Sequence, residues 1–111
     1  MILETAIFTV RPGEADIFRE AFARGRRFIE SAPGFQRLEM RQGIEAPDSF
    51  ILVVWWETLE HHTQTFKQSD NFTQWRAIVG HLFAAPPVVN HYLAEAAGLS
   101  PVLVRTLGRK L

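Results

Sequence analysis

The sequence predicts an α+β domain of the ferredoxin-like type, with the element order β-α-β-β-α-β and a four-stranded antiparallel sheet. Three features predict this class. Four β-rich segments occur, at residues 2–11, 35–43, 49–57 and 88–94. Helical periodicity of the apolar residues follows the first and the third of these segments. A turn, expected at residues 45–48, separates the second segment from the third.

The first strand and the first helix are marked by their end signals. Residues 2–11, ILETAIFTVR, stop at Pro12-Gly13, which is a turn signal. The helix expected over residues 14–29 begins with acidic residues and ends with arginines, an order that suits the helix dipole, and Pro33-Gly34 ends it. Its apolar stripe consists of Phe18, Ala21, Phe22, Gly25, Phe28 and Ile29.

The third strand, from Ser49 to Glu57, is apolar on both of its alternating faces. One set is Phe50, Leu52, Val54 and Trp56, and the other is Ile51, Val53 and Trp55. A half-buried strand in a small antiparallel sheet normally has one polar face. We therefore expect a second copy of the chain to cover the sheet face that the helices leave open, which gives a homodimer.

Two helical segments are expected after this strand, from Thr58 to Gln68 and from about Asp70 to Phe83, with Ser69 or Asp70 as the cap at the break. Pro86-Pro87 ends the second segment, and the fourth strand follows. Residues 1–94 are expected to form one domain. The tail, residues 95–111, is expected to add a short edge strand or to reach over the partner.

Composition excludes several classes of function. Lys plus Arg equals Asp plus Glu, at 12 each, so no net field favours nucleic acid or a membrane surface as a partner. The absence of cysteine excludes disulfides and thiolate chemistry. There is no Gly-rich phosphate loop and no metal-ligand spacing around the histidines, so we expect no cofactor and no metal. The N-terminal run lacks a basic region and contains Glu4, which predicts a cytoplasmic, soluble protein without a signal peptide.

His62 is the candidate catalytic residue of the first helical segment. Leu59, Thr63 and Phe66 stand at helical spacing with it. This spacing places His62 on the inward stripe and turns His61 toward solvent. An inward imidazole in apolar surroundings needs a partner, so His62 is either a satisfied core histidine or a poised base.

Further side chains are expected to border the space between the sheet and the second helix. The candidates for substrate binding are Trp56, Phe66, Trp75 and Arg76. Arg76 either reaches a ligand or lies on the surface. A mostly apolar cavity with a few convergent polar groups is typical of a small-molecule site, but aromatic residues at helical spacing are also typical of a core.

The fourth strand offers one of two alternating sets to the same space. His91 shares a face with Val89 and Leu93, whereas Tyr92 shares a face with Val88 and Asn90. The sequence alone leaves open which set faces the helices.

Taken together, these segments resemble the antibiotic biosynthesis monooxygenase family. The resemblance rests on WETLEHH at residues 56–62, SDNF at residues 69–72 and PPVVNHY at residues 86–92. It also includes the opening strand and helix, and it covers about residues 2–94.

The resemblance implies a dimeric α+β barrel. It also implies an activity, because characterised members of the family include oxygenases that act on quinols or polycyclic aromatic compounds without metal or flavin. A haem-degrading subgroup uses an Asn, a Trp and an iron-ligating His at positions that correspond to Thr5, Phe66 and Arg76 here. All three residues depart from that pattern, so haem degradation is the least favoured activity.

We therefore expect a cofactor-independent monooxygenase that oxidises a small aromatic or quinol-like substrate with O2 in an apolar pocket between sheet and helices. His62 is the expected base, and Asn90 or Tyr92 is expected to hydrogen-bond the substrate oxyanion. Trp56, Phe66 and Trp75 are expected to stack on the substrate ring. The alternative is a non-catalytic homodimeric module that binds a small ligand or acts in a stress response.

Overall fold

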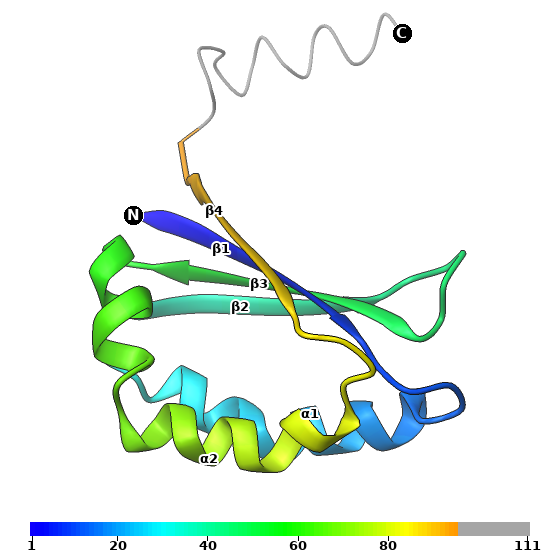
Figure 1. Ribbon diagram of the computed structural model, residues 1–111. Helices are drawn as coiled ribbons and strands as arrows, with labels where there is room; N and C mark the ends of the chain where they lie inside the picture. The colour runs from blue at the N-terminus through cyan, green and yellow to red at the C-terminus, as the bar shows by residue number, and fades with distance from the viewer. Residues whose placement is uncertain (96–111) are drawn as a thin grey trace, which may run out of the picture.

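Strands and helices follow one another in the predicted order. The structure, a computed structural model, describes residues 1–95. Its elements are β1 (Ile2–Thr9), α1 (Ala15–Glu30), β2 (Phe35–Gln42), β3 (Ser49–Trp56), the short helix η1 (His61–Phe66), α2 (Asp70–Val79), the short helix η2 (Gly80–Leu82) and β4 (Val88–Leu93) (Figure 1). The expectation for the tail falls, beyond Glu95, outside the described residues.

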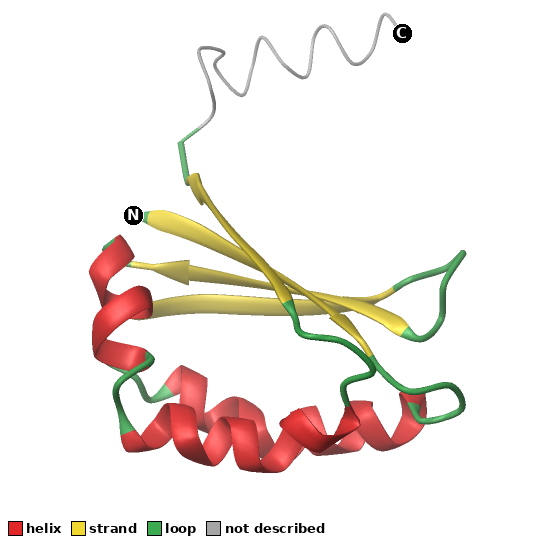
Figure 2. Ribbon diagram, in the orientation of Figure 1, coloured by secondary structure: helices red, strands yellow, loops and turns green. Residues whose placement is uncertain are grey.

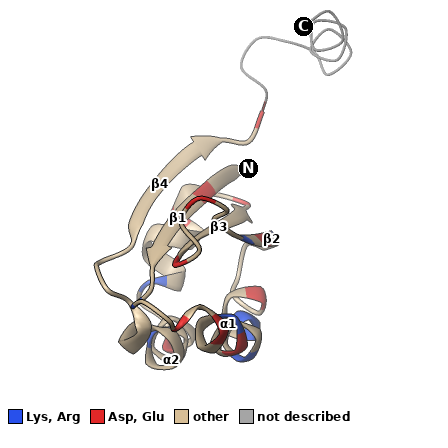
Figure 3. Ribbon diagram, turned by 90° about the vertical axis from the view of Figure 1, so that its right-hand side faces the viewer, with Lys and Arg blue, Asp and Glu red and all other residues tan. Residues whose placement is uncertain are grey.

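The strands form one antiparallel sheet in the order β2-β3-β1-β4. Both long helices lie on one face of this sheet (Figures 2 and 3). The predicted ferredoxin-like arrangement is therefore confirmed. In the register, Glu4 of β1 stands opposite Val54 of β3 on one side and His91 of β4 on the other. Residues that stand opposite each other in antiparallel strands share a face, so these three side chains form one row beneath the helices.

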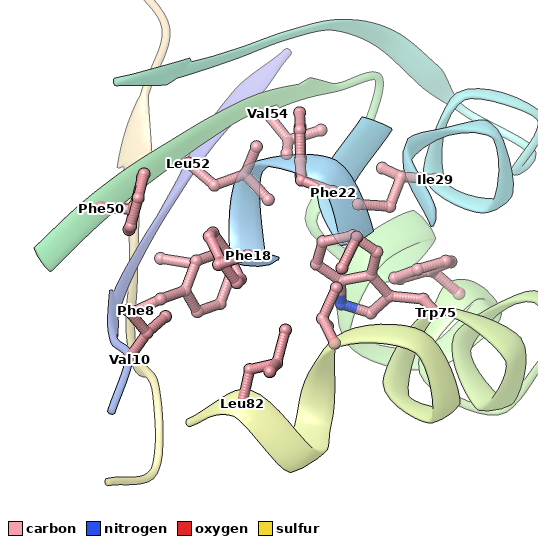
Figure 4. Packing of buried hydrophobic residues seen from close by; sticks show 14 of the residues in the cluster. Phe8, Val10, Phe18, Phe22, Ile29, Phe50, Leu52, Val54, Trp75 and Leu82 are labelled. Carbon is pink, nitrogen blue, oxygen red and sulfur yellow. The ribbon is translucent and has the colours of Figure 1, made fainter. Parts of the chain in front are cut away.

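The core fills the space between the helices and the inner face of the sheet. On β3 the inner set ending in Trp56 is buried, as predicted, whereas Ile51 on the outer face is 36% exposed. The stripe predicted for α1 is buried apart from Phe28, which is half-buried. Trp75 reaches from α2 into this cluster and meets the ring of Phe22 edge-on, with centroids 5.9 Å apart (Figure 4).

The segment after β3 differs from the regular α-helix that the spacing predicts. In η1 the amide of Lys67 lies 3.3 Å from the carbonyl of His62, five residues earlier, which is the hydrogen bond of a π-helix. This wider turn keeps His62 and Phe66 on the buried face, at 3% and 4% exposure. Leu59 is turned outward and is 39% exposed, so its predicted place on the inward stripe was wrong.

The second helical segment has a different end from the predicted one. Ser69, one of the two caps that the sequence predicted, caps α2, because its side chain accepts a hydrogen bond from the amide of Phe72. The α-helix ends at Val79 instead of Phe83, and the tighter turn η2 follows. This change of winding brings the chain back toward β4.

His61 packs against the start of β2 and is half-buried, so the prediction that it is solvated was wrong. Its ring lies over Gly34, whose φ is +82°. A Cβ at Gly34 would lie 2.2 Å from Cγ of His61. Nδ1 of His61 is 2.7 Å from the hydroxyl of Thr58, and the amide of Glu57 donates to the carbonyl of Gly34 at 2.8 Å. These contacts fix how η1 leaves β3, and so they position the next residue, His62.

We predict that Gly34→Ala destabilises the protein by roughly 2–4 kcal/mol. The new Cβ adds the strain of a left-handed backbone, about 1 kcal/mol, and also overlaps the ring of His61. The matched control is Gly13→Ala, where φ is +81° but nothing lies within 4 Å of the added Cβ. Urea unfolding of both variants measures the difference. The double variant Gly34→Ala/His61→Ala should recover most of the excess loss, and equal losses in the two single variants would contradict the overlap.

Candidate functional site

A buried carboxylate lies at the centre of the candidate site. Glu4 is 6% exposed and lies on the inner face of β1, in line with Ala6 and Phe8 of the core. Burying a carboxylate is costly unless partners satisfy its oxygens. Nε1 of Trp56 donates a hydrogen bond to Oε1 of Glu4 at 2.9 Å, and Nε2 of His62 lies 3.3 Å from Oε2. Each oxygen therefore has its own partner.

His62 connects this carboxylate to β4. Its Nδ1 lies 2.8 Å from Nε2 of His91, a hydrogen bond between the two imidazoles. The His62 ring also stacks on the indole of Trp56, with centroids 5.6 Å apart and an interplanar angle of 22°. His62 is buried, whereas His91 is an exposed residue. The chain of contacts therefore runs from the interior at Glu4 to the surface at His91.

Burial governs the protonation of these groups. It raises the pKa of Glu4 to about 7, although the hydrogen bond from Trp56 and the positive charge of Lys67 act in the opposite direction. Burial also lowers the pKa of His62 to about 4, assisted by His91 and Lys67, and it lowers the pKa of His91. Near neutral pH, His62 is therefore uncharged, and its contact with Glu4 at 3.3 Å is a polar contact instead of an ion pair. Glu4 is the group of this pair that titrates near pH 7.

A cavity of about 160 Å³ lies beside Glu4 and His62. Most of its wall is apolar and comes from Ala6, Phe8, Ile29, Leu52, Val54, Phe66, Phe72, Trp75, Phe83, Pro87 and Val89. Lys67 and Arg76 add positive charge to the wall. An adjoining surface groove of about 350 Å³ shares Arg76, Phe83 and Pro87 with the cavity, so these residues form its mouth. The guanidinium carbon of Arg76 lies 5.4 Å from the centre of the Phe83 ring.

The structure brings four of the predicted site residues together. His62, Phe66, Trp75 and Arg76 all contribute to the cavity wall. Trp56 is not among the lining residues; it is fully buried, stacks on His62 and donates to Glu4. Its contacts are those of a residue that positions the carboxylate.

The structure separates Asn90 and Tyr92 from the cavity. They stand opposite Thr5 and Leu3 on the outer face of the sheet, and Tyr92 is 54% exposed. The other alternating set of β4, which contains His91, faces the helices. The question that the sequence left open is therefore answered in favour of the His91 set.

Sequence reasoning missed Glu4 and Lys67 as members of the site, and it did not choose His91. A signal for Glu4 exists, because it falls on the same alternating set of its strand as Phe8, where a carboxylate must be buried. No local spacing links Glu4 with His62, since the two meet only through the register of the sheet and the path of η1.

Two kinds of feature are absent from residues 1–95. No group of three or more His, Cys, Asp or Glu side chains has an arrangement suited to holding a metal ion. Glu4, His62 and His91 contact one another in series instead of converging on one point. No helix in this range is both long enough and apolar enough to cross a bilayer.

We predict that Glu4→Gln removes part of the pH dependence of folding stability. The pKa of Glu4 rises from 4.5 to about 7 on folding, so the folded state holds this proton more tightly than the unfolded state does. The contribution of Glu4 to stability therefore falls as pH rises from 4.5 to about 7, and the variant lacks this fall, which amounts to at most about 3 kcal/mol. Urea unfolding at about pH 5 and about pH 8 measures it.

Glu20→Gln makes the same chemical change on the exposed side of α1 and controls for the substitution itself. Relative to the wild type, Glu4→Gln should be more stable at the higher pH than at the lower pH. Parallel stability profiles for the wild type and Glu4→Gln would show that burial does not raise the pKa of this carboxyl.

Known proteins share the sequence pattern and the fold of this chain. The family model described as antibiotic biosynthesis monooxygenase matches residues 1–78. The "putative antibiotic biosynthesis monooxygenase" of Bordetella bronchiseptica is 38% identical, with a TM-score of 0.82 over 86% of this chain and 97% of that chain. The uncharacterized protein YczJ of Bacillus subtilis (strain 168) is 28% identical over 92 residues, which cover 83% of this chain and 97% of YczJ.

The fold also matches that of a variant of SnoaB, a cofactor-independent oxygenase from Streptomyces nogalater. The TM-score is 0.70 at 19% identity, over 89% of this chain and 97% of that chain, so this match concerns the fold alone. The family model, in contrast, covers most of the chain and includes Glu4, His62 and Trp75. The chain therefore belongs to the antibiotic biosynthesis monooxygenase family.

Proposed function

We propose that the protein is a cofactor-independent monooxygenase that oxidises a small phenol or quinol with O2. Membership of the family supports a monooxygenase-type activity. The observation that carries the proposal is the mostly apolar cavity with the buried Glu4–His62 pair in its wall. The cofactor-independent chemistry is inferred from SnoaB, with which the chain shares its fold.

The size of the cavity favours a substrate with one aromatic ring. Its volume of about 160 Å³ is close to that of an apolar cavity of about 150 Å³ that binds benzene. Phe66, Phe72 and Trp75 offer ring faces and edges to such a substrate. A polycyclic compound would have to extend through the mouth past Arg76. We therefore assign a monocyclic phenol or quinol to the cavity and a substrate substituent to Arg76.

Glu4 and His62 share the role of base that the sequence assigned to His62 alone. With Glu4 ionised, its carboxylate accepts the proton of the substrate hydroxyl and leaves a phenolate in dry surroundings. Nε2 of His62 holds the carboxylate in place. Lys67, in the same wall, stabilises the negative charge on the phenolate and then on the reduced oxygen, the role that the sequence had assigned to Asn90 or Tyr92.

The reaction needs no external reductant. The phenolate gives one electron to O2, and the superoxide formed joins a ring carbon that carries hydrogen, para to the oxygen in a phenol and ortho in a hydroquinone. The resulting peroxide takes the proton back from Glu4. Loss of the C–H proton at that carbon then breaks the O–O bond, and the hydroxide released leaves with that proton as water. One substrate molecule and one O2 thus give one quinone and one water, and the ring supplies all the electrons.

We also propose that a second copy of the chain covers the outer face of the sheet. Ile7 and Ile51 are 42% and 36% exposed there, and Tyr92 lies on the same face. Arg37 and Glu39 of β2 border this apolar area and form an ion pair within the chain, and two copies related by a two-fold axis can extend this pairing across the interface. Such a dimer places Tyr92 in the interface and away from the cavity.

The activity is tested by oxygen uptake with a panel of monocyclic phenols and hydroquinones. We expect O2 consumption with quinone formation, and kcat/KM should rise with pH with a midpoint near 7 as Glu4 loses its proton. His62→Ala should lower kcat by about 10²–10⁴-fold. The control is His81→Ala, an exposed histidine of η2 outside the cavity wall, which should keep the wild-type rate.

Unchanged turnover in a folded His62→Ala variant would contradict the role of the Glu4–His62 pair. Tight binding of phenols without O2 consumption would contradict the oxygenase and favour the non-catalytic binding module.

The dimer is tested by sedimentation of Ile51→Glu. A carboxylate in the proposed interface should convert dimers to monomers, because it would be buried without a partner. Ile17→Glu is the matched control, since Ile17 is 53% exposed on α1, on the helical side of the sheet. Wild-type chains that sediment as monomers, or Ile51→Glu chains that remain dimeric, would contradict this interface.

A further inference from the structure

Glu4, His62 and His91 form a continuous series of polar contacts between the cavity and the surface. Glu4 and His91 are register partners on β1 and β4, and His62 reaches both of them from η1. The two contacts measure 3.3 Å and 2.8 Å. Oε1 of Glu4 is occupied by the Trp56 indole, so only Oε2 takes part in the series.

The series has two complete protonation patterns on the same heavy-atom positions. When Glu4 is ionised, Nε2–H of His62 donates to Glu4, and Nε2–H of His91 donates to Nδ1 of His62. When Glu4 is protonated, its O–H donates to Nε2 of His62, and Nδ1–H of His62 donates to Nε2 of His91. In both patterns each buried proton lies between two neighbouring members of the series, and neither pattern requires a ring to rotate.

The two patterns differ by one proton, which enters or leaves at Nδ1 of His91. A proton that binds there moves the Nε2 proton of His91 to His62, and the Nε2 proton of His62 to Glu4. The reverse movement discharges Glu4 to solvent. Each step makes one N–H or O–H bond and breaks another, so the charge changes only at Glu4 and at the solvent.

We propose that His91 is the solvent end of a proton path that runs through His62 and sets the protonation state of Glu4. The path deepens the proposed function, because a Glu4 that is still protonated when substrate fills the cavity and excludes water can lose its proton to solvent through the path before the reaction begins. His91 is then a positioning residue that never touches substrate, and His62 has a role on both of its ring nitrogens.

The surroundings of the series support proton exchange with Glu4 through the two imidazoles. The charged side chains that face it from the packed elements are Lys67, after η1, and Arg76, on α2 at the cavity mouth. Neither cation accepts a proton, and the remaining wall residues are apolar. Among the described residues, the imidazoles are therefore the groups that can exchange a proton with Glu4.

The test is NMR of the full-length protein with isotope-labelled histidine rings, followed without substrate from about pH 5.5 to about pH 9. We expect His62 to change from the Nδ1–H form at the lower pH to the Nε2–H form at the higher pH, and His91 to change with the same midpoint. In Glu4→Gln this linked change should disappear. A single His62 tautomer over the whole range, or separate midpoints for the two rings, would overturn the proposal.

A second measurement separates a path from a merely structural contact. His91→Phe keeps a ring on β4 but removes the proton carrier, so exchange between the two forms of Glu4 should slow on the order of a hundredfold, and added imidazole should restore it. His81→Phe is the control on η2, with no expected effect. Unchanged exchange in His91→Phe would overturn the path. Both measurements are made without turnover, so they can be interpreted even if no oxygenase activity is found. A negative result in them would not affect the test of oxygenase activity.

Discussion

The structure depends on one costly feature, a carboxylate buried in an apolar core. Transferring an isolated ion of this kind into a protein interior costs much free energy, and two features of the structure reduce this cost. Trp56 donates a hydrogen bond to one oxygen of Glu4, and Nε2 of His62 lies 3.3 Å from the other. Burial also raises the pKa of Glu4 to about 7, so the neutral acid is readily available. A group that is kept on the boundary between its two forms is suited to receiving and returning a proton near neutral pH.

The fold supplies these partners from distant parts of the chain. The strand order puts β1 between β3 and β4, so that Glu4 has Val54 and His91 as its direct neighbours. The π-helical turn η1 then sets His62 above them, and the contact of His61 with Gly34 fixes where that turn begins. The cavity lies next to this assembly because the side chains between sheet and α2 do not fill the space completely. The same few residues thus define the core, the base and the pocket.

Much of the fold could be predicted from the sequence, because it follows from local periodicity. The two apolar sets of β3, the stripe of α1 and the cap at Ser69 are all local signals, and the structure agrees with them. The inward position of His62 was also predictable from its spacing to Phe66. Leu59 and His61 were placed wrongly, because their spacing was read with an α-helical period and the chain forms a π-helical turn there.

The site was less predictable, because its contacts join residues far apart in the chain. Glu4 and His91 meet through strand register, which a single sequence does not specify, and the choice between the two faces of β4 follows from the same register. Trp56 was predicted at the site for its aromatic ring, but its contact with Glu4 is made by the indole nitrogen. The buried carboxylate of Glu4 needs polar partners, and this need, more than the number of aromatic residues, explains why Trp56 and His62 lie beside it.

The most direct test of this account is a titration of the Glu4 carboxyl itself. Carbon NMR of the protein with labelled glutamate side chains follows each carboxyl separately, and the Glu4 signal is identified by its loss in Glu4→Gln. The account predicts a midpoint near 7 for Glu4, because desolvation outweighs the hydrogen bond from Trp56 and the charge of Lys67. A midpoint at or below the ordinary value of 4.5 would mean that Glu4 is a fixed anion, and would contradict its role as the base.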